Sequence, residues 1–178
     1  MSQSLLDALD GWNSVKSAEL YGVSAWGQGY FKVTEDGYVA VNLKNGKGTV
    51  SVKFCDIVNG IHDRGMSLPL LLRFSDLLGS RIRLINESFK KAITEYGYQN
   101  VYRGAFPIKV NQQQQAVHDV VTFGAPYHHG LEAGSKAELI AALAYMRDPE
   151  AFLICNGYKD AEFIDLAISS LKMGLQTI

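Results

Sequence analysis

A repeated pattern of an apolar strand followed by an amphipathic helix limits the possible folds of this chain more than any other feature. Four such units are expected between residues 68 and 178. Because parallel neighbours need a crossover connection, strands that alternate with helices predict a parallel sheet. The strands are predicted at Leu68–Phe74, at Tyr102–Val110, in a short segment that reaches about Glu132, and at Ala151–Cys155, with Gln176–Ile178 as the first residues of a fifth.

Two architectures satisfy this pattern, an open doubly wound sheet and part of a (β/α)8 barrel. A fifth strand that starts where the chain stops favours the barrel, because a barrel of this type needs eight units. We therefore expect an α/β protein that forms the N-terminal portion of a TIM-like (β/α)8 barrel, with about four βα units.

The helices are predicted from apolar residues at three- and four-residue steps. Ser75–Asp76 can cap the longest helix, and Gly124 and Gly174 are expected to end two others. The sequence Ser135–Glu138 reads as a capping box that opens a further helix. The apolar face of the longest helix is predicted to consist of Leu78, Ile82, Ile85, Phe89 and Ile93.

The first part of the chain has a different composition, rich in Gly, Tyr, Val and Thr. Three short strands are predicted there, at Tyr30–Val33, Tyr38–Leu43 and Thr49–Val52. Glu35–Gly37 and Lys44–Gly46 are expected to be their turns, since Asp-Gly and Asn-Gly adopt positive φ at little cost. We expect residues 1–55 to form a β-rich lead-in and residues 56–178 to form the partial barrel.

The charge balance argues against two classes of partner. Lys and Arg number 17 and Asp and Glu 18, for a formal net charge of −1. The basic residues form no run, so neither nucleic acid nor a membrane is an expected partner. Cys55 and Cys155 are predicted to be free thiols, and the start of the chain lacks the blocks of a signal peptide. These features predict a cytoplasmic protein.

Lys109 is the first candidate for chemistry, because it falls at the carboxyl end of the second predicted strand. Ligand sites of parallel α/β folds lie at that end of the strands. One interpretation is a solvated or ion-paired lysine. The other is an amine that bonds covalently to a carbonyl group, which it must attack unprotonated. The apolar neighbours Phe106, Pro107, Ile108 and Val110 would desolvate such an amine and favour its neutral form.

Several stretches of the chain, taken together, resemble the biosynthetic arginine decarboxylases. They are SAELYGVSAWGQGYF, LPLLLRFSDLL, YRGAFPIKVNQQQQ, GLEAGSKAEL and LICNGYKD, and the likeness runs from about Trp12 to Ile178. The resemblance implies a pyridoxal-phosphate enzyme of the alanine-racemase fold type. It implies that Lys109, the lysine of the PIKVNQ motif, holds the cofactor as an imine. It also implies decarboxylation of arginine to agmatine and CO2 in polyamine biosynthesis, a magnesium requirement and a homo-oligomer.

Other residues have weaker claims. Glu132 matches an acidic position near the lysine and the cofactor ring in related decarboxylases, but it is equally consistent with an acid that a helix dipole favours. Glu138 is expected to cap a helix. His128 and His129 are adjacent on a strand and point to opposite faces, so we predict no metal site there. No residue is assigned to magnesium.

The family's phosphate-binding glycines, its later histidine motif and its C-terminal β-domain would all follow Ile178. We therefore expect an N-terminal fragment that is marginally stable and inactive by itself. Two alternatives stay open. One is a non-catalytic remnant that acts as a binding module. The other is a different enzyme of the same fold type, such as alanine racemase or diaminopimelate decarboxylase.

Overall fold

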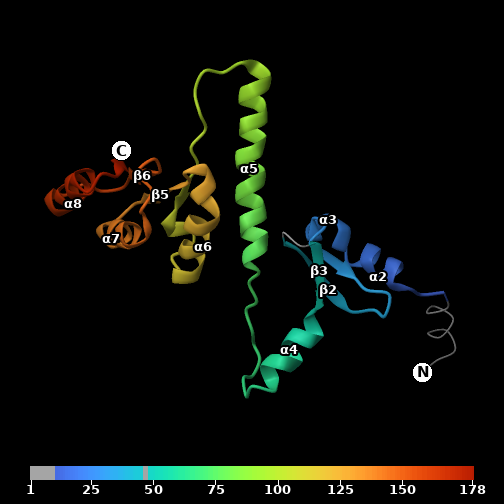
Figure 1. Ribbon diagram of the computed structural model, residues 1–178. Helices are drawn as coiled ribbons and strands as arrows, with labels where there is room; N and C mark the ends of the chain where they lie inside the picture. The colour runs from blue at the N-terminus through green and yellow to red at the C-terminus, as the bar shows by residue number, and fades with distance from the viewer. Residues whose placement is uncertain (1–10, 46–47) are drawn as a thin grey trace. The chain divides into compact units, whose positions relative to one another are not determined.

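The computed structural model describes residues 11–45 and 48–178. They form two compact units, one that ends at Asp76 and one that runs from Leu77 to Ile178 (Figure 1). The turn predicted at Lys44–Gly46 lies partly outside the described residues. Each unit is described by itself.

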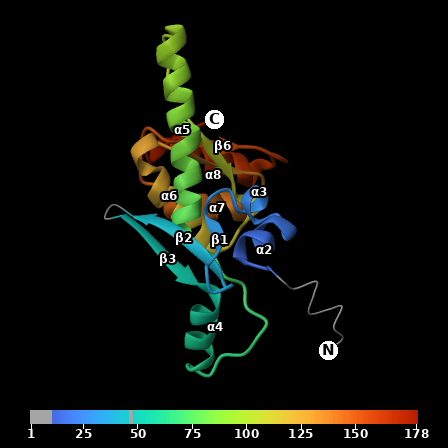
Figure 2. The same cartoon turned by 90° about the vertical axis from the view of Figure 1, so that its right-hand side faces the viewer.

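The first unit contains the predicted antiparallel strands, in the order β1–β2–β3 (Figure 2). The sequence did not predict the helices of this unit that lie within the described residues. In α2 the Asn13 side chain accepts hydrogen bonds from the first-turn N–H groups, which the helix itself cannot satisfy. The elements are α2 (Ser14–Leu20), α3 (Val23–Gly27), β1 (Phe31–Val33), β2 (Val39–Asn45), β3 (Gly48–Lys53) and α4 (Phe54–His62).

The prediction of a strand at Leu68–Phe74 is wrong. Neither sheet of the described residues includes this segment. A strand is stabilised by a hydrogen-bonded neighbour, and Pro69 lacks an N–H to donate. The apolar run is partly solvated, with Leu71 76% exposed. An apolar run has the composition of a buried strand, but composition does not show whether a neighbouring strand hydrogen-bonds to it.

The second unit carries a sheet of four parallel strands in chain order, β4–β5–β6–β7, with helices in the connections (Figure 1). This is the pattern of consecutive units of a (β/α) barrel. No helix of the described residues is long and apolar enough to cross a membrane. The elements are α5 (Ser75–Tyr96), β4 (Ala105–Pro107), η1 (Ile108–Val110), α6 (Gln114–Gly124), η2 (Ala125–Tyr127), β5 (Gly130–Ala133), α7 (Lys136–Tyr145), β6 (Phe152–Cys155), α8 (Ala161–Lys172) and β7 (Gln176–Thr177).

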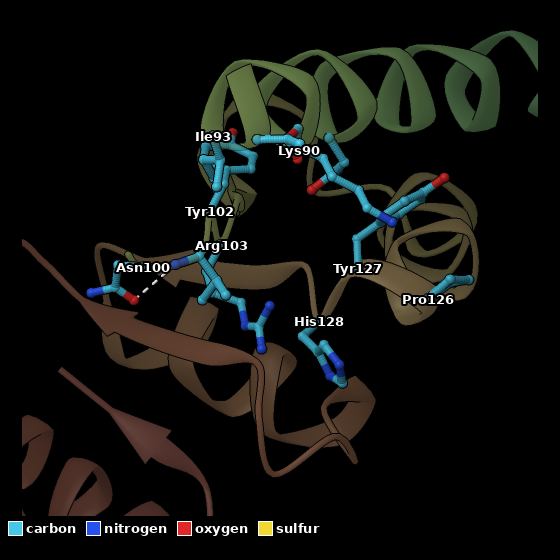
Figure 3. A pocket seen from close by; sticks show the side chains of 11 residues that line it. Lys90, Ile93, Asn100, Tyr102, Arg103, Pro126, Tyr127 and His128 are labelled. Carbon is cyan, nitrogen blue, oxygen red and sulfur yellow. Dashed lines mark hydrogen bonds between the residues drawn. The ribbon is translucent and has the colours of Figure 1, made fainter. Parts of the chain in front are cut away.

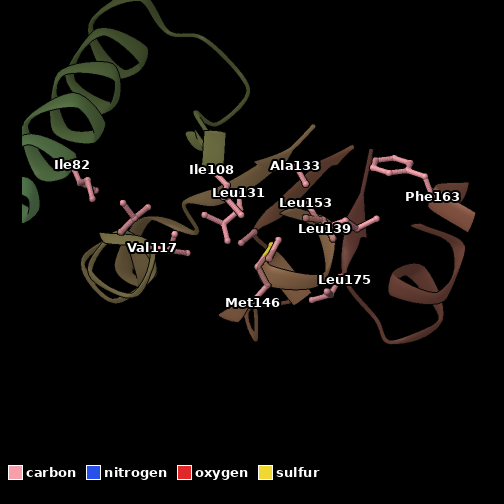
Figure 4. Packing of buried hydrophobic residues seen from close by; sticks show 13 residues of the cluster. Ile82, Ile108, Val117, Leu131, Ala133, Leu139, Met146, Leu153, Phe163 and Leu175 are labelled. Carbon is pink, nitrogen blue, oxygen red and sulfur yellow. The ribbon is translucent and has the colours of Figure 1, made fainter. Parts of the chain in front are cut away.

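The core of this unit lies between the sheet and its helices. Leu131 and Leu153 are register partners on β5 and β6, and both are fully buried. They belong to one cluster with Val117 of α6, Leu139 of α7 and Phe163 of α8 (Figure 4). Since successive side chains of a strand alternate between faces, the helices cover the face that carries Leu131. The next residue of β5, Glu132, faces the other way.

The second predicted strand is shorter than expected. It ends at Pro107, and Lys109 lies in the 3-10 turn η1 rather than on the strand. Ile108 is 1% exposed and anchors this turn in the core, while the N–H of Asn111 donates to the Ile108 carbonyl (3.0 Å). A buried aliphatic residue in a tight turn has the same apolar character as a strand residue, so the sequence did not separate the two.

Gly124 is the last residue of α6, but not because it supplies a left-handed conformation. Its φ is −80°, and the left-handed residue is His128, at φ 52°. A Cβ on Gly124 would lie 2.6 Å from the Cβ of His129. Glycine is needed here for the close approach of His129. At the end of α8, by contrast, Gly174 has φ +87°, as predicted for a helix C-cap.

Candidate functional site

The carboxyl ends of β4 and β5 bring Lys109 and Glu132 together. Lys109 follows β4 within η1, and Glu132 is the register partner of Pro107 on β5. The Nζ of Lys109 lies 3.8 Å from the Oε1 of Glu132. The amine therefore points toward the rim where the strands end, as the interpretation of Lys109 as a site residue requires.

The expectation that apolar neighbours desolvate Lys109 is wrong for the described residues. Its side chain is 63% exposed, whereas that of Glu132 is 17% exposed. Ile108 is buried beneath the turn and Val110 is 69% exposed, so neither covers the amine. Because it is exposed, the amine can reach an external aldehyde and attack it. Its immediate neighbour is a carboxylate rather than an apolar surface.

A residue that sequence reasoning did not identify completes this group. Asn156 follows β6, and its Nδ2 donates to Oε1 of Glu132 (3.1 Å). Its Oδ1 accepts a hydrogen bond from the N–H of Gly157 (2.8 Å). Lys109, Glu132 and Asn156 thus lie at or just after the carboxyl ends of three consecutive strands. The signal was present in the sequence, since an Asn-Gly pair directly after a predicted parallel strand falls on the same rim.

Glu138 is a cap, as predicted, and also a link between two loops. Ser135 Oγ accepts from the N–H of Glu138 (3.2 Å), and Glu138 Oε2 accepts from the N–H of Gly134 (2.7 Å). Its other oxygen accepts from Nε2 of Gln112 (2.8 Å). Gln112 lies in the loop that carries Lys109, so Glu138 fixes that loop against the start of α7.

An ion-pair group joins the starts of α7 and α8. The Nζ of Lys136 lies 2.8 Å from Asp160 and 2.6 Å from Glu162. The hydrogen bonds that Lys136 donates to Asp160 and Glu162 raise the pKa of Lys136 above its ordinary value. The bond from Lys136, together with that from the N–H of Phe163, lowers the pKa of Asp160. The loops after β5 and β6 are therefore tied together by charge.

The same two loops also meet through their backbones. A Cβ on Gly157 would lie only 2.2 Å from the carbonyl oxygen of Gly134, and Gly157 has φ +80°. Glycine is required at position 157 by both space and conformation. This contact places Asn156, its neighbour, close to the end of β5.

Two of the cavities bordered by described residues of this unit lie at opposite ends of the strands. One of about 360 Å³ is bordered by Ile108, Gln112 and Glu138, next to the rim. The other, of about 480 Å³, lies where the strands begin (Figure 3). Figure 3 shows Lys90, Arg103 and His128 around it. The second cavity therefore lies away from Lys109, on the face that in barrels serves stability rather than chemistry.

The two adjacent histidines lie at that opposite end and have separate environments. His128 Nδ1 lies 2.8 Å from Asp148, whose pKa is raised by burial but lowered more strongly by the Glu150 N–H and by His128. His129 is partly buried, and its Nδ1 has no hydrogen-bond partner among the described residues. Burial lowers the pKa of His129, which favours the neutral ring.

The part of the chain that the structure describes offers no group of three or more His, Cys, Asp or Glu side chains placed to hold a metal ion. The donor set around Lys109 instead suits an organic carbonyl ligand. It consists of an accessible primary amine, a carboxylate that can balance its charge, and an amide that holds the carboxylate. Such a set can hold an aldehyde on the amine and move a proton to and from Nζ.

Comparison with known families finds one match. Residues 82–176 match the family described as "Pyridoxal-dependent decarboxylase, pyridoxal binding domain". The matched region includes Lys109, Glu132 and Asn156.

Similar proteins carry one recurrent name. A biosynthetic arginine decarboxylase of Gloeobacter violaceus is 47% identical over 163 residues, which cover 92% of this chain and 25% of that protein. One from Prochlorococcus marinus is 45% identical over 167 residues, which cover 94% of this chain and 26% of that protein. The chain thus spans about a quarter of the length of the curated relatives it matches.

The fold has a counterpart among solved structures. The crystal structure of the biosynthetic arginine decarboxylase of Campylobacter jejuni aligns with a TM-score of 0.79 at 38% identity. The alignment covers 88% of this chain and 26% of that one. The sheet and helices of the second unit are the N-terminal portion of a (β/α)8 barrel of the alanine-racemase type.

Proposed function

The chain belongs to the pyridoxal-dependent decarboxylase family, and from this membership we propose that it is the N-terminal part of a biosynthetic arginine decarboxylase. The reaction is the conversion of arginine to agmatine and CO2, which serves polyamine biosynthesis. The observation that carries the proposal is the accessible amine of Lys109 at the carboxyl ends of the strands, 3.8 Å from Glu132. The names of the relatives support arginine as the substrate.

We assign a role to each of the two site residues. Lys109 holds the aldehyde of pyridoxal 5'-phosphate through Nζ, and Glu132 balances charge at that nitrogen. When bound, the cofactor accepts the electron pair that remains as carbon dioxide departs. With its amine free, Lys109 carries a proton at Nζ that it can deliver to the product. Glu132 lies close enough to pair with the amine when it carries that proton.

Several finer points belong to the same proposal. Within the enzyme, residues 1–55 form the lead-in and residues 56–178 contribute to the cofactor-binding barrel. The assembled enzyme is a cytoplasmic homo-oligomer. The family's magnesium is assigned to no residue here, because the described residues provide no suitable ligand group.

We further propose that the chain alone does not decarboxylate arginine. It covers about a quarter of its relatives' length, 25% of the protein from Gloeobacter violaceus. Its described rim supplies an amine and a carboxylate, but other groups must bind the phosphate and the pyridine nitrogen. Arginine-dependent release of carbon dioxide from the purified monomeric chain would contradict this point.

Borohydride reduction in the presence of pyridoxal phosphate tests the role of Lys109. Reduction makes the bond to the amine permanent, and mass spectrometry then locates the label. We expect the label on the peptide that contains Lys109, and its loss in Lys109→Ala. Lys172→Ala, at the last turn of α8, is the matched control and should keep the label.

Label spread evenly over the surface lysines would contradict the role of Lys109. No label on a chain that circular dichroism shows to be folded would favour the alternative, a non-catalytic binding module.

A further inference from the structure

We propose that Asn156 is a positioning residue that holds the carboxylate of Glu132 against the amine of Lys109. The role of Asn156 in orienting Glu132 does not depend on the proposed function, whereas any effect on cofactor binding by Lys109 rests on it. Glu132 Oε1 is approached by two groups, Asn156 Nδ2 at 3.1 Å and Lys109 Nζ at 3.8 Å. The amide therefore contacts the same oxygen that faces the amine.

Asn156 is itself held in place by two further hydrogen bonds. Its backbone N–H donates to the carbonyl of Ala133 (2.8 Å), which continues the pairing of β5 with β6. Its Oδ1 is occupied by the N–H of Gly157 (2.8 Å). With the oxygen turned toward Gly157, the planar amide directs Nδ2 toward Glu132. The position of Nδ2 is therefore fixed by contacts that do not involve Glu132.

The loop that carries Asn156 is fixed as well. Gly157 packs against the carbonyl of Gly134, and Lys136 binds Asp160 (2.8 Å) at the far end of the same loop. Glu132 lies on β5, whose backbone is paired on both sides. A rigid donor and a rigid strand leave only the side-chain torsions of Glu132 free, and the amide restrains these.

The consequence concerns the access of electrophiles to the amine. A carboxylate held beside an ammonium group pairs with it and shields it from solvent-borne reagents. Without the amide, the Glu132 side chain regains rotational freedom and turns toward water. Lys109 then loses its ion-pair partner, and its amine is less shielded from electrophiles. Asn156 therefore acts on Lys109 through Glu132, not by contact with it.

Competitive labelling measures this without any cofactor. The full chain is treated with a trace of acetic anhydride, and the acetylation of Lys109 relative to Lys172 is read by mass spectrometry. We expect Asn156→Ala to raise this ratio by roughly 1.5- to 5-fold, the range that an exposed ion pair allows. Glu132→Gln should raise it at least as much, and the double variant should equal Glu132→Gln alone.

Two further variants keep the test sharp. Asn156→Ser keeps a hydroxyl that can accept from the N–H of Gly157, but its side chain is too short to reach Glu132. It should raise the acetylation ratio as Asn156→Ala does, and it replaces that variant if the alanine chain does not fold. Asn100→Ala is the matched control, because Asn100 Oδ1 accepts from the next N–H (2.8 Å) but has no contact with Glu132. Its ratio should stay at the wild-type value.

The inference fails if both Asn156 variants leave the ratio unchanged in a folded chain. It also fails if Asn156→Ala raises the ratio equally in the Glu132→Gln background, since that effect would not pass through the carboxylate. A failed reduction experiment with pyridoxal phosphate would reject the proposed function and leave this result intact, so the two can fail separately.

Discussion

At the scale of single residues, the sheet and its rim depend on glycines that allow backbones to approach. A Cβ on Gly130 would lie 1.9 Å from the carbonyl oxygen of Phe152, so β5 and β6 could not pair as they do with any side chain there. Gly157 meets Gly134 in the same way. These positions support the site without contributing any functional group to it.

Comparison of two glycines tests this role of Gly157. Gly157 and Gly174 both have positive φ, +80° and +87°, but only at Gly157 would a Cβ meet another backbone atom. We expect Gly174→Ala to lower the free energy of unfolding by about 1–2 kcal/mol, the cost of the left-handed conformation. Gly157→Ala should cost more and should reduce labelling of Lys109 by pyridoxal phosphate. Denaturant unfolding would measure both, and equal losses would contradict the argument.

Asp160 gives a pH dependence with a definite sign. Its pKa is lower in the folded chain than its ordinary value, because Lys136 and the N–H of Phe163 bind the carboxylate. Its ionised form therefore stabilises the fold at neutral pH, and this is lost as pH falls through the folded pKa. We expect Asp160→Asn to lower Tm at pH 7 and to leave it unchanged once the pH lies below the folded pKa of Asp160. A Tm difference that persists in acid would contradict this.

At the scale of elements, the sequence predicted those whose local signals and tertiary packing agree. The capping box at Ser135–Glu138 and the glycine at 174 marked α7 and α8 closely. Leu68–Phe74 failed because strand formation depends on a partner, which an apolar run does not reveal. In the site, Lys109 and Glu132 were predicted through motif and strand end. Asn156 was not, because its role arises from a hydrogen bond between residues 24 positions apart.

The N-cap of α7 can be tested with a matched serine. Ser135→Ala removes the acceptor for the N–H of Glu138 and should cost about 1 kcal/mol. Ser169 lies inside α8, where its hydroxyl bonds the carbonyl of Asp165 (2.7 Å). Such back-bonding adds little to a helix, so Ser169→Ala should be close to neutral. Chemical denaturation compares the two, and a larger loss at Ser169 would contradict the capping argument.

At the scale of the whole molecule, the chain has two compact units with separate cores. The second unit has the cluster around Leu131 and Leu153, whereas the first buries Val23, Ala40 and Val41. We therefore expect each unit to lose stability on its own, and the site around Lys109 to depend on the core of the second unit.

The two tryptophans allow the unfolding of the first unit to be followed separately from that of the second. The chain contains two, Trp12 and Trp26, both in the first unit. We expect Leu131→Ala to destabilise the second unit by about 2–5 kcal/mol. Its unfolding, followed by circular dichroism, should then shift while the tryptophan fluorescence transition stays in place. Val41→Ala should shift the fluorescence transition instead. Coincident shifts in both signals would show that the units unfold together.

The register of β4, β5 and β6 has an evolutionary consequence. Pro107, Glu132 and Ile154 lie side by side across three strands. An inserted or deleted residue inside β5 would move Glu132 onto the helix-covered face. Homologues should therefore show no insertions or deletions within this strand. The turns that precede the strands, such as the segment between Tyr145 and Phe152, carry no such constraint. Homologous lineages should accumulate their length differences there.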